Sequence, residues 1–248
     1  LLAPRPQIDF APALNELRPD AVPFPFGLPR LDGAERRGVI LQRVREKERI
    51  GPAGIRVIPA GSGVRALTML DDDRWTRLVE SVDEISRELD FLLIDTATGI
   101  GDTVLDVIGL ADYVLVVTSF DPASVVDAYA IIKLVTGANA STPVGVVVNT
   151  ARDAEEGHLV FRQISSAAER FLGRSLRYDG HVLEDRSVKD ATLAQLPLMS
   201  GEAAGPASRD IRRLACRLTA ARPSGNGPWP AVHPTAVLKA VVTGASQC

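Results

Sequence analysis

The 248-residue chain is 46% hydrophobic and carries 28 lysines and arginines against 31 aspartates and glutamates, a formal net charge of −3. This composition can fill the core of one α/β domain with appendages or of two small domains, and it excludes both a disordered chain and a protein that mainly coats nucleic acid. Two cysteines without ligand-like spacing exclude a zinc or disulfide framework, and the lack of an apolar run of about 18 residues excludes a membrane-spanning helix.

The first 53 residues are predicted to be irregular. Seven prolines fall within residues 1–36, more closely spaced than a helix or a central strand tolerates. A short charged helix is expected over Val39–Arg49. The β-branched run Ile55–Pro59 then predicts a strand that enters the loop Ala60–Gly63. This loop lacks the lysine and the spacing G-x-x-x-x-G-K-[ST] of a phosphate loop, so we interpret it as a structural turn.

Two apolar runs form the centre of the predicted fold. Phe91–Asp95 reads FLLID, Tyr113–Thr118 reads YVLVVT, and a helix-length segment separates them. Strands that are apolar at consecutive positions must be covered on both faces, which is typical of a buried parallel sheet. The amphipathic helix expected over Asp71–Leu89 leads into the first of these strands. An aspartate at the carboxyl end of such a strand lies where open α/β sheets bind ligands, which makes Asp95 the first candidate site residue.

The second half of the chain continues the alternation of helices and strands. Pro122 suits the first position of a helix capped by Asp121, and Gly173 suits the end of a helix over Glu155–Leu172. The remaining predicted elements are the strands Val144–Asn149 and Leu176–Leu183 and the helices Val104–Leu110, Val125–Val135, Glu184–Ala194 and Ala207–Ala221. Successive β-α-β units predict a doubly wound, mostly parallel sheet with flanking helices. We assign this α/β domain to residues 54–221, and residues 222–248 to a linker and tail.

Several polar residues follow the predicted strands, and each has a structural interpretation beside a functional one. Asp95 either holds a metal ion or caps the next turn through backbone N–H groups. Thr96 and Thr98 either contact phosphate or water or bond to nearby backbone. Asn149 either reads a base with its amide or closes a turn. The three histidines are isolated in the sequence and form no triad or ligand pattern, so the residues give no support to a nucleophilic or zinc mechanism.

Four motifs occur in order along the chain: IRVIPAGSG, FLLIDTATGIGDTV, VVVNTARDAEEG and YDGHVLEDRSVKD. Together they resemble the MinD/ParA family of deviant P-loop ATPases, and within it the flagellar number regulators. The resemblance covers about Gly54 to Leu218 and rests on the order and spacing of several motifs. It implies a P-loop NTPase-like fold, ATP-dependent dimerisation and ATP hydrolysis with Mg²⁺.

The resemblance also implies roles for individual residues. Asp95 matches the Walker B aspartate, which is catalytic and holds the metal ion, and Thr96 and Gly99 match the switch loop that follows it. Asn149 matches the asparagine that reads the adenine edge. The segment that packs on the base matches Leu183, Glu184 and Asp185. Leucine stands there in place of the family's usual proline.

One part of the family pattern does not occur in these 248 residues. The chain has no G-K-[ST] sequence, and residues 1–53 match neither the family's first strand nor its phosphate loop. Without the N–H groups and lysine of that loop, phosphoryl transfer loses most of its positioning and charge neutralisation. We therefore expect an N-terminally incomplete domain with impaired or absent ATP hydrolysis. Three hypotheses stay open: an ATPase switch that regulates flagellar number or placement, a non-catalytic interaction protein of the same fold, and an incomplete gene product.

Expected partners and location follow from the same resemblance. It implies ATP and Mg²⁺ as cofactors, a homodimer, flagellar assembly or regulatory proteins as partners, and a place at the cell pole. No nucleic-acid partner is evident in the sequence. The tail from Thr235 has one lysine and no large aromatic residue, so we expect little of the peripheral membrane contact that an amphipathic helix provides. The expected location is the cytoplasm.

Overall fold

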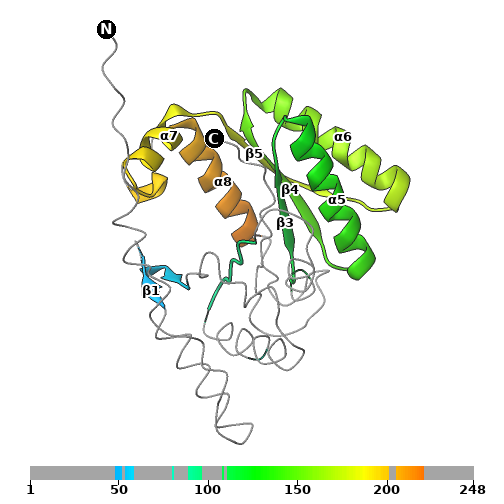
Figure 1. The fold of residues 1–248 in the computed structure, drawn as a ribbon, viewed down its shortest axis with the longest axis horizontal. Helices are drawn as coiled ribbons and strands as arrows, with labels where there is room; N and C mark the ends of the chain where they lie inside the picture. Colours follow the sequence, from blue (N-terminus) through cyan, green and yellow to red (C-terminus); the bar gives the residue numbers. More distant parts are fainter. Residues whose placement is uncertain are drawn as a thin grey trace, which may run out of the picture.

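A computed structural model gives the fold of the chain (Figure 1). The structure describes residues 48–51, 54–58, 80, 89–96, 108, 111–200 and 205–220. Within this part of the chain the main sheet has three parallel strands in the order β3 (Val114–Thr118), β4 (Val144–Ala151) and β5 (Arg177–Leu183). The parallel ladders bring the carboxyl ends of all three strands to one edge of the sheet. All three strands are at sites where the sequence predicts them.

The two crossover helices cover one face of this sheet. α5 (Pro122–Ala138) joins β3 to β4, and α6 (Ala154–Leu172) joins β4 to β5. The carboxylate of Asp121 accepts the N–H of Ser124 at 3.1 Å and caps α5. α6 ends at Gly173, whose φ of 61° is a left-handed conformation that glycine adopts without strain. The start of α5 at Asp121 and the end of α6 at Gly173 therefore confirm the sequence prediction.

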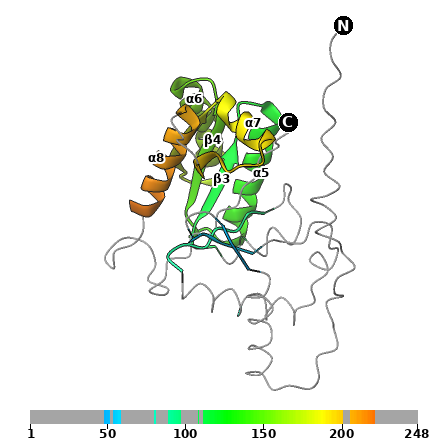
Figure 2. The ribbon, with the colours of Figure 1, turned by 90° about the vertical axis from the view of Figure 1, so that its left-hand side faces the viewer.

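The opposite face of the sheet carries α8 (Pro206–Ala220), which packs on β5. The short α7 (Arg186–Leu193) and the 3-10 turn η3 (Leu198–Ser200) precede it. Figure 1 shows α8 on one side of the strands and the pair α5 and α6 on the other, and the turned view of Figure 2 separates α8 from α5 as well. Among the described helices, none is long and apolar enough to cross a membrane. Helices on both faces of a parallel sheet confirm the predicted doubly wound, P-loop NTPase-like α/β class.

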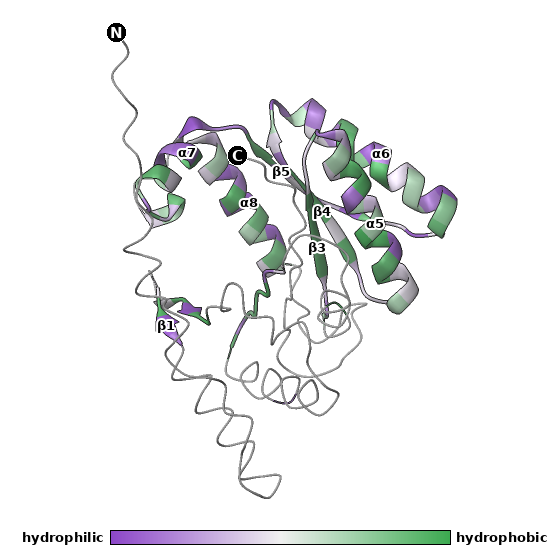
Figure 3. Cartoon of the chain, in the orientation of Figure 1, coloured by the Kyte–Doolittle hydropathy of each residue, from purple (hydrophilic) through white to green (hydrophobic). Residues whose placement is uncertain are grey.

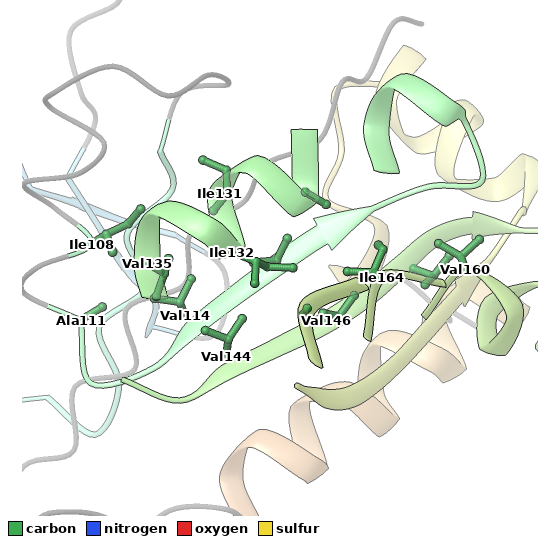
Figure 4. Close-up of a cluster of buried hydrophobic side chains, with 14 of the residues drawn as sticks. Ile108, Ala111, Val114, Ile131, Ile132, Val135, Val144, Val146, Val160 and Ile164 are labelled. Carbon is green, nitrogen blue, oxygen red and sulfur yellow. The ribbon is translucent and has the colours of Figure 1, made fainter. Parts of the chain in front are cut away.

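Strand residues that point to opposite faces fill two cores. Val114 and Val146 face the crossover helices, where Ile132 and Ile164 are buried against them (Figure 4). Residues such as Leu115 point to the other face and pack against α8. Both faces are therefore apolar, and Figure 3 shows hydrophobic residues along β3 and much of β4. Full burial of each such aliphatic side chain stabilises the fold by about 1.5–3 kcal/mol.

A buried polar cluster lies on the α8 face, towards the amino ends of the strands. The phenol of Tyr113 donates a hydrogen bond to the fully buried carboxylate of Asp179, and Arg177 Nε donates to the same carboxylate at 2.6 Å. Burial, together with the charge of Asp179, raises the pKa of Tyr113 far above its ordinary value. A Cβ atom at Gly145 would lie against both partners, so glycine is required beneath this pair. Asp179 is also the extra residue of a β-bulge in β5.

The predicted parallel strand Ile55–Pro59 is wrong. Only β2 (Arg56–Val57) forms there, and it pairs antiparallel with β1 (Arg49–Ile50) in a separate two-stranded sheet. Ile55 is 60% exposed, so this run lacks the cover on both faces that a central strand needs. A local turn, in which Gly51 N–H donates to the carbonyl of Ile55 at 2.7 Å, pairs the segment with its own neighbour instead. β1 also places a strand inside the segment 1–53 that we predict to be irregular.

The predicted strand Phe91–Asp95 is wrong as well. The structure assigns no strand to residues 90–96, and no ladder of the described sheets includes them. Leu93 is 65% exposed, and the other apolar residues of the run are only half-buried. The apolar pattern therefore overstates the burial of this segment.

Several other predicted elements lie largely outside the described residues. Arg49, the last residue of the helix predicted over Val39–Arg49, belongs to β1, and the rest of that helix up to residue 47 is outside the described part. Glu80 and Ile108 are helical, in agreement with the helices predicted around them, whose other positions are mostly outside it too. The loop 60–63 and the tail 222–248 are also outside. The division of the chain at residues 53 and 221 stays a prediction.

Candidate functional site

The carboxyl ends of the strands form the candidate site, as expected for an open parallel sheet. At the end of β3, Ser119 N–H donates to Ser124 Oγ at 3.0 Å, and Thr118 Oγ1 lies 3.2 Å from the same oxygen. These bonds fix the end of the strand to the first turn of α5. Phe120 follows, 49% exposed, with the guanidinium carbon of Arg152 5.5 Å from the centre of its ring. The edge thus presents an aromatic face with a cation over it.

A bulge at the end of β4 turns Asn149 out of the ladder. Asn149 and Thr150 of β4 stand opposite the single residue Val182 of β5. Thr150 has φ of 53°, a left-handed conformation that is unusual for a β-branched residue, and its hydroxyl donates to the carbonyl of Asn149 at 2.8 Å. Both residues are exposed. Bulges of this kind redirect side chains, and the role of Asn149 as a contact residue stays a prediction.

The loop after β4 is held by the buried carboxylate of Glu156. Its Oε2 accepts the backbone N–H of Arg152 at 2.7 Å, and its Oε1 accepts Arg152 Nε at 2.7 Å. These bonds, the backbone bond above all, lower the pKa of Glu156. Glu156 N–H in turn donates to Asp153 at 2.8 Å, which caps α6. The loop that follows the bulge is therefore fixed before any ligand arrives.

Asp185 joins two helices. Its Oδ1 accepts the N–H of Ser187 at 2.9 Å and caps α7, and its Oδ2 accepts the N–H of Ala207 at 3.1 Å at the start of α8. These hydrogen bonds lower the pKa of Asp185, and the bond from Ser187 N–H has the largest effect. A Cβ atom at Gly205 would lie against Oδ2, so the close approach of α8 requires glycine there. Both oxygens already accept protein N–H groups, and direct contact between Asp185 and a cofactor stays a prediction.

The two residues before Asp185 are fixed through their backbone. Leu183 N–H donates to Asp210 Oδ2 at 3.2 Å, and Glu184 N–H donates to the carbonyl of Ala151 at 2.8 Å. The second bond places Glu184 directly beside the end of β4. The side chain of Glu184 is exposed and that of Leu183 is half-buried. The fold thus brings three predicted contact residues, Asn149, Leu183 and Glu184, to neighbouring strand ends.

The acid and hydroxyl predicted for the phosphate side lie in the segment 90–96, which does not extend the sheet. Asp95 is exposed, and Thr96 is half-buried with a buried hydroxyl that has no hydrogen-bond partner among the described residues. An orphaned hydroxyl of this kind is a donor and acceptor that a ligand can use. Thr98 and Gly99 lie outside the described residues. No group of three or more metal-binding side chains occurs in the part of the chain that the structure describes, and the metal role of Asp95 stays a prediction.

The sequence does not reveal a cluster of rings at the outer edge of β5. Tyr178 Oη lies 2.9 Å from His181 Nδ1, and the ring centres of His158 and Tyr178 are 4.5 Å apart. The ring centres of the two histidines are 6.4 Å apart. Tyr178 and His181 share a predicted strand and His158 lies in the helix before it, which is the only signal of their proximity that the sequence contains.

Comparison with known proteins finds relatives that match part of the chain. The chain is 37% identical to the antiactivator FleN of Pseudomonas aeruginosa over 146 residues, which are 59% of this chain and 52% of FleN. It is 29% identical to the flagellum site-determining protein YlxH of Helicobacter pylori over 132 residues, 52% of this chain and 44% of YlxH. It is 27% identical to an uncharacterised ATP-binding protein of Methanocaldococcus jannaschii over 172 residues, 69% of this chain and 61% of that protein. These similarities support the predicted resemblance to the MinD/ParA-type family.

One of these relatives, YlxH, is named for a flagellar function, in agreement with the predicted likeness to flagellar number regulators. The chain spans about half the length of the curated relatives it matches. No protein-family model matches the chain. The parallel sheet with helices on both faces and the polar strand ends agree with a MinD/ParA-type fold.

Proposed function

We propose that this chain is part of a MinD/ParA-type switch protein that regulates flagellar number or placement. The observation that carries the flagellar role is the match with the flagellum site-determining protein YlxH over 132 residues, and the match with the antiactivator FleN over 146 residues supports a regulatory role. The partners are then flagellar assembly or regulatory proteins, and the acting species is a homodimer at the cell pole. The proposed location is the cytoplasm, with little peripheral contact with the inner membrane.

The base side of a nucleotide site is proposed at the ends of β4 and β5. The bulge directs Asn149 to this edge, and an amide side chain offers the donor and acceptor that together match an adenine edge. The side chains of Leu183 and Glu184 flank the base, while Asp185 holds this segment against α8. ATP with Mg²⁺ is the proposed cofactor. When bound, it supplies the phosphoryl group and the cation that neutralises the developing charge.

The phosphate side is proposed to include Asp95, Thr96 and Gly99, with Asp95 as the metal ligand. The buried, unpartnered hydroxyl of Thr96 supports a polar ligand at this segment. The 248 residues include no G-K-[ST] loop, so these residues lack its N–H donors and lysine. A carboxylate beside phosphates without a well-held cation repels them. We therefore propose that this chain binds a nucleotide weakly and does not hydrolyse ATP at a family-like rate.

A specific observation favours a second candidate, a non-catalytic interaction protein of the same fold. Asp185 and the backbone of Leu183 and Glu184 already join β5, α7, α8 and the end of β4. This corner of the fold is therefore complete without a nucleotide. Such a protein would keep its partner-binding helices and its effect on flagellar number while binding no ATP.

Nucleotide binding distinguishes the two candidates. A fluorescent ATP analogue is titrated into the 248-residue chain and into Asn149→Ala, with Asn139→Ala, an exposed asparagine after α5, as the matched control. We expect weak binding that prefers ATP to GTP and is weakened about three- to tenfold by Asn149→Ala alone, the worth of one side-chain hydrogen bond. Equal binding by all three proteins would contradict the base contact, and no binding by any of them would support the non-catalytic candidate.

The flagellar role has its own test. Flagella per cell are counted in a strain that lacks the corresponding gene and in the same strain expressing the full gene or its Gly145→Ala variant, whose buried cluster is disrupted. We expect the full gene to restore the number and the destabilised Gly145→Ala variant to restore it less well. An unchanged number in every strain would contradict a role in flagellar regulation.

A further inference from the structure

A polar pocket of about 250 Å³ lies along the outer edge of β5. α6 forms one wall with His158, and α8 forms the other with Asp210, Arg213 and Arg217. β5 supplies the floor, including His181. Figure 1 shows β5 between these two helices, and both pack on it. The volume is below the roughly 300–1,000 Å³ of pockets for drug-sized ligands, so it suits a single side chain or small ion.

The acids at this pocket are turned towards protein partners. Asp179 is fully buried, and its carboxylate is bonded to Tyr113 and Arg177 on the α8 face of the sheet. Asp210 is 5% exposed and accepts the N–H of Leu183. Arg177 offsets the charge of Asp179, and Arg213, 3.1 Å from Asp210, offsets the charge of that carboxylate. Arg217 bonds a backbone carbonyl, so its positive charge is left to act on whatever enters the pocket.

The cationic groups at the mouth of the pocket are arginines of α8. Arg213 Nη1 donates to Asp210 at 3.1 Å, and Arg217 Nη1 donates to the carbonyl of Asp179 at 2.7 Å. A guanidinium carries five N–H donors in a planar fork, so each of these bonds uses a small part of its capacity. The two arginines are four residues apart and so share one face of the helix. This geometry matches an oxyanion, which a guanidinium binds through two parallel hydrogen bonds.

The basic surface continues beyond the pocket along α8. This helix has four arginines and one aspartate, whereas the whole chain has a net charge of −3, so positive charge is concentrated here. Arg212 and Arg213 are both exposed. An extended acidic segment can place one carboxylate in the pocket and others along the helix. A lone small anion would use only the first of these contacts.

The occupant does not add a strand to β5. Asp179 forms a bulge there, and the guanidinium of Arg217 covers the adjacent Gly180 and bonds the carbonyl that an added strand would use. Bulges and long cationic side chains are devices that block pairing at a sheet edge. Recognition at this edge therefore runs through side chains and not through backbone hydrogen bonds.

We propose that this pocket binds a carboxylate side chain of an acidic segment in a partner protein, with α8 as the docking surface for the rest of that segment. The histidines and Tyr178 complete the walls around the carboxylate. The lining of this pocket differs from the proposed nucleotide site, because it includes neither Asn149 nor Asp95. The two sites meet at Asp210, which lines the pocket and accepts the N–H of Leu183.

The test measures binding of a fluorescein-labelled hexaglutamate peptide by fluorescence anisotropy at constant salt. The proteins are the 248-residue chain, the variant Arg213→Glu and the matched control Arg170→Glu. The control makes the same charge change in the last turn of α6, whereas His158 of the pocket lies near the start of that helix. Arg213 lies on the exposed surface of α8, and Arg213→Ala, which adds no new charge, serves if the glutamate variant unfolds. We expect Arg213→Glu to weaken binding at least about tenfold, the loss of a charge-assisted bond. Arg170→Glu should bind like the parent chain.

Three results would overturn the proposal. Equal weakening by Arg170→Glu would show that net charge, and not the pocket, binds the peptide. Complete displacement of the peptide by orthophosphate at an equal concentration of charge would show a small-anion site only. Tighter binding of a random DNA duplex than of the peptide, with the same loss in Arg213→Glu, would assign α8 to nucleic acid.

Discussion

Replacing Asp185 with alanine tests whether this residue holds the fold together or serves a nucleotide. In the folded chain its carboxylate accepts two backbone N–H groups, from Ser187 at 2.9 Å and from Ala207 at 3.1 Å. Alanine removes both acceptors, and the first turns of α7 and α8 are left with donors that lack this partner. Asp121→Ala is the matched control, because Asp121 caps α5 through a single bond to Ser124.

The expected loss follows from the two bonds. Loss of an N-cap aspartate costs about 1 kcal/mol, and loss of a hydrogen bond to a charged group costs about 1.5–3 kcal/mol. Asp185 is half-buried, so we take the lower part of the second range and expect about 2–3 kcal/mol in total. For a chain of this length that is a fall in Tm of about 4–12 °C. The single cap of Asp121 predicts about 1 kcal/mol.

The pH dependence gives a second signature of the same bonds. The pKa of Asp185 is lowered in the folded chain, so the carboxylate contributes stability that is fully present above its unfolded pKa, about 3.9. That contribution is lost as the pH falls through the folded pKa. The difference in unfolding free energy between the parent chain and Asp185→Ala should therefore be constant near neutral pH and shrink below about pH 4.

Urea and thermal unfolding, followed by far-UV circular dichroism, measure all three proteins. We expect the order parent, Asp121→Ala, Asp185→Ala from most to least stable. A variant Asp185→Ala that unfolds with the parent, or that loses no more stability than Asp121→Ala, would refute the structural role. In that case the carboxylate would be available to a ligand, as the family likeness implies.

Three further changes have expected outcomes. Gly145→Ala should lower the free energy of unfolding by about 1–3 kcal/mol, because its Cβ meets the buried phenol and carboxylate. Gly137→Ala lies in open space within α5 and should raise the free energy of unfolding by about 0.5–1 kcal/mol. Thermal melts that rank the two variants the other way would contradict the packing. Gly173→Ala should cost about 1–2 kcal/mol, since alanine is strained at its φ of 61°, and an unchanged urea midpoint would argue against this conformation. Glu156 has a lowered pKa, so Glu156→Gln should lose less stability than the parent as the pH falls below about 4.3; parallel urea midpoints at neutral and acid pH would show that its bonds contribute nothing.

The parts of the fold that the sequence predicts correctly carry two agreeing local signals. β3 and β4 are continuous apolar runs between well-marked helices, and α5 and α6 have a capping aspartate or a terminal glycine that the structure uses as expected. Phe91–Asp95 has a similar apolar pattern but is only partly buried. An apolar run becomes a buried strand only if a neighbouring strand pairs with it and other elements pack on both of its faces. The sequence of the run itself specifies neither condition.

The candidate site shows the same limit. Asn149 follows a predicted strand, yet the bulge that exposes it depends on the register between β4 and β5, which no local pattern specifies. Asp185 is visible in the sequence as a helix cap, but its second bond reaches Ala207, 22 positions along the chain. His158 and His181 meet only because α6 packs beside β5. Contacts between distant elements are therefore what sequence reasoning misses here.

Steady-state phosphate release tests most directly whether this chain hydrolyses ATP. The 248-residue chain is incubated with ATP and Mg²⁺, beside its Asp95→Ala variant and a protein-free blank. Loss of one preorganised donor costs about 10²–10³ in rate, and the phosphate loop supplies several such donors that this chain lacks. We expect both proteins to match the blank. Turnover by the parent chain that Asp95→Ala abolishes would contradict the account, because it would show that another stretch of these residues acts as the phosphate loop.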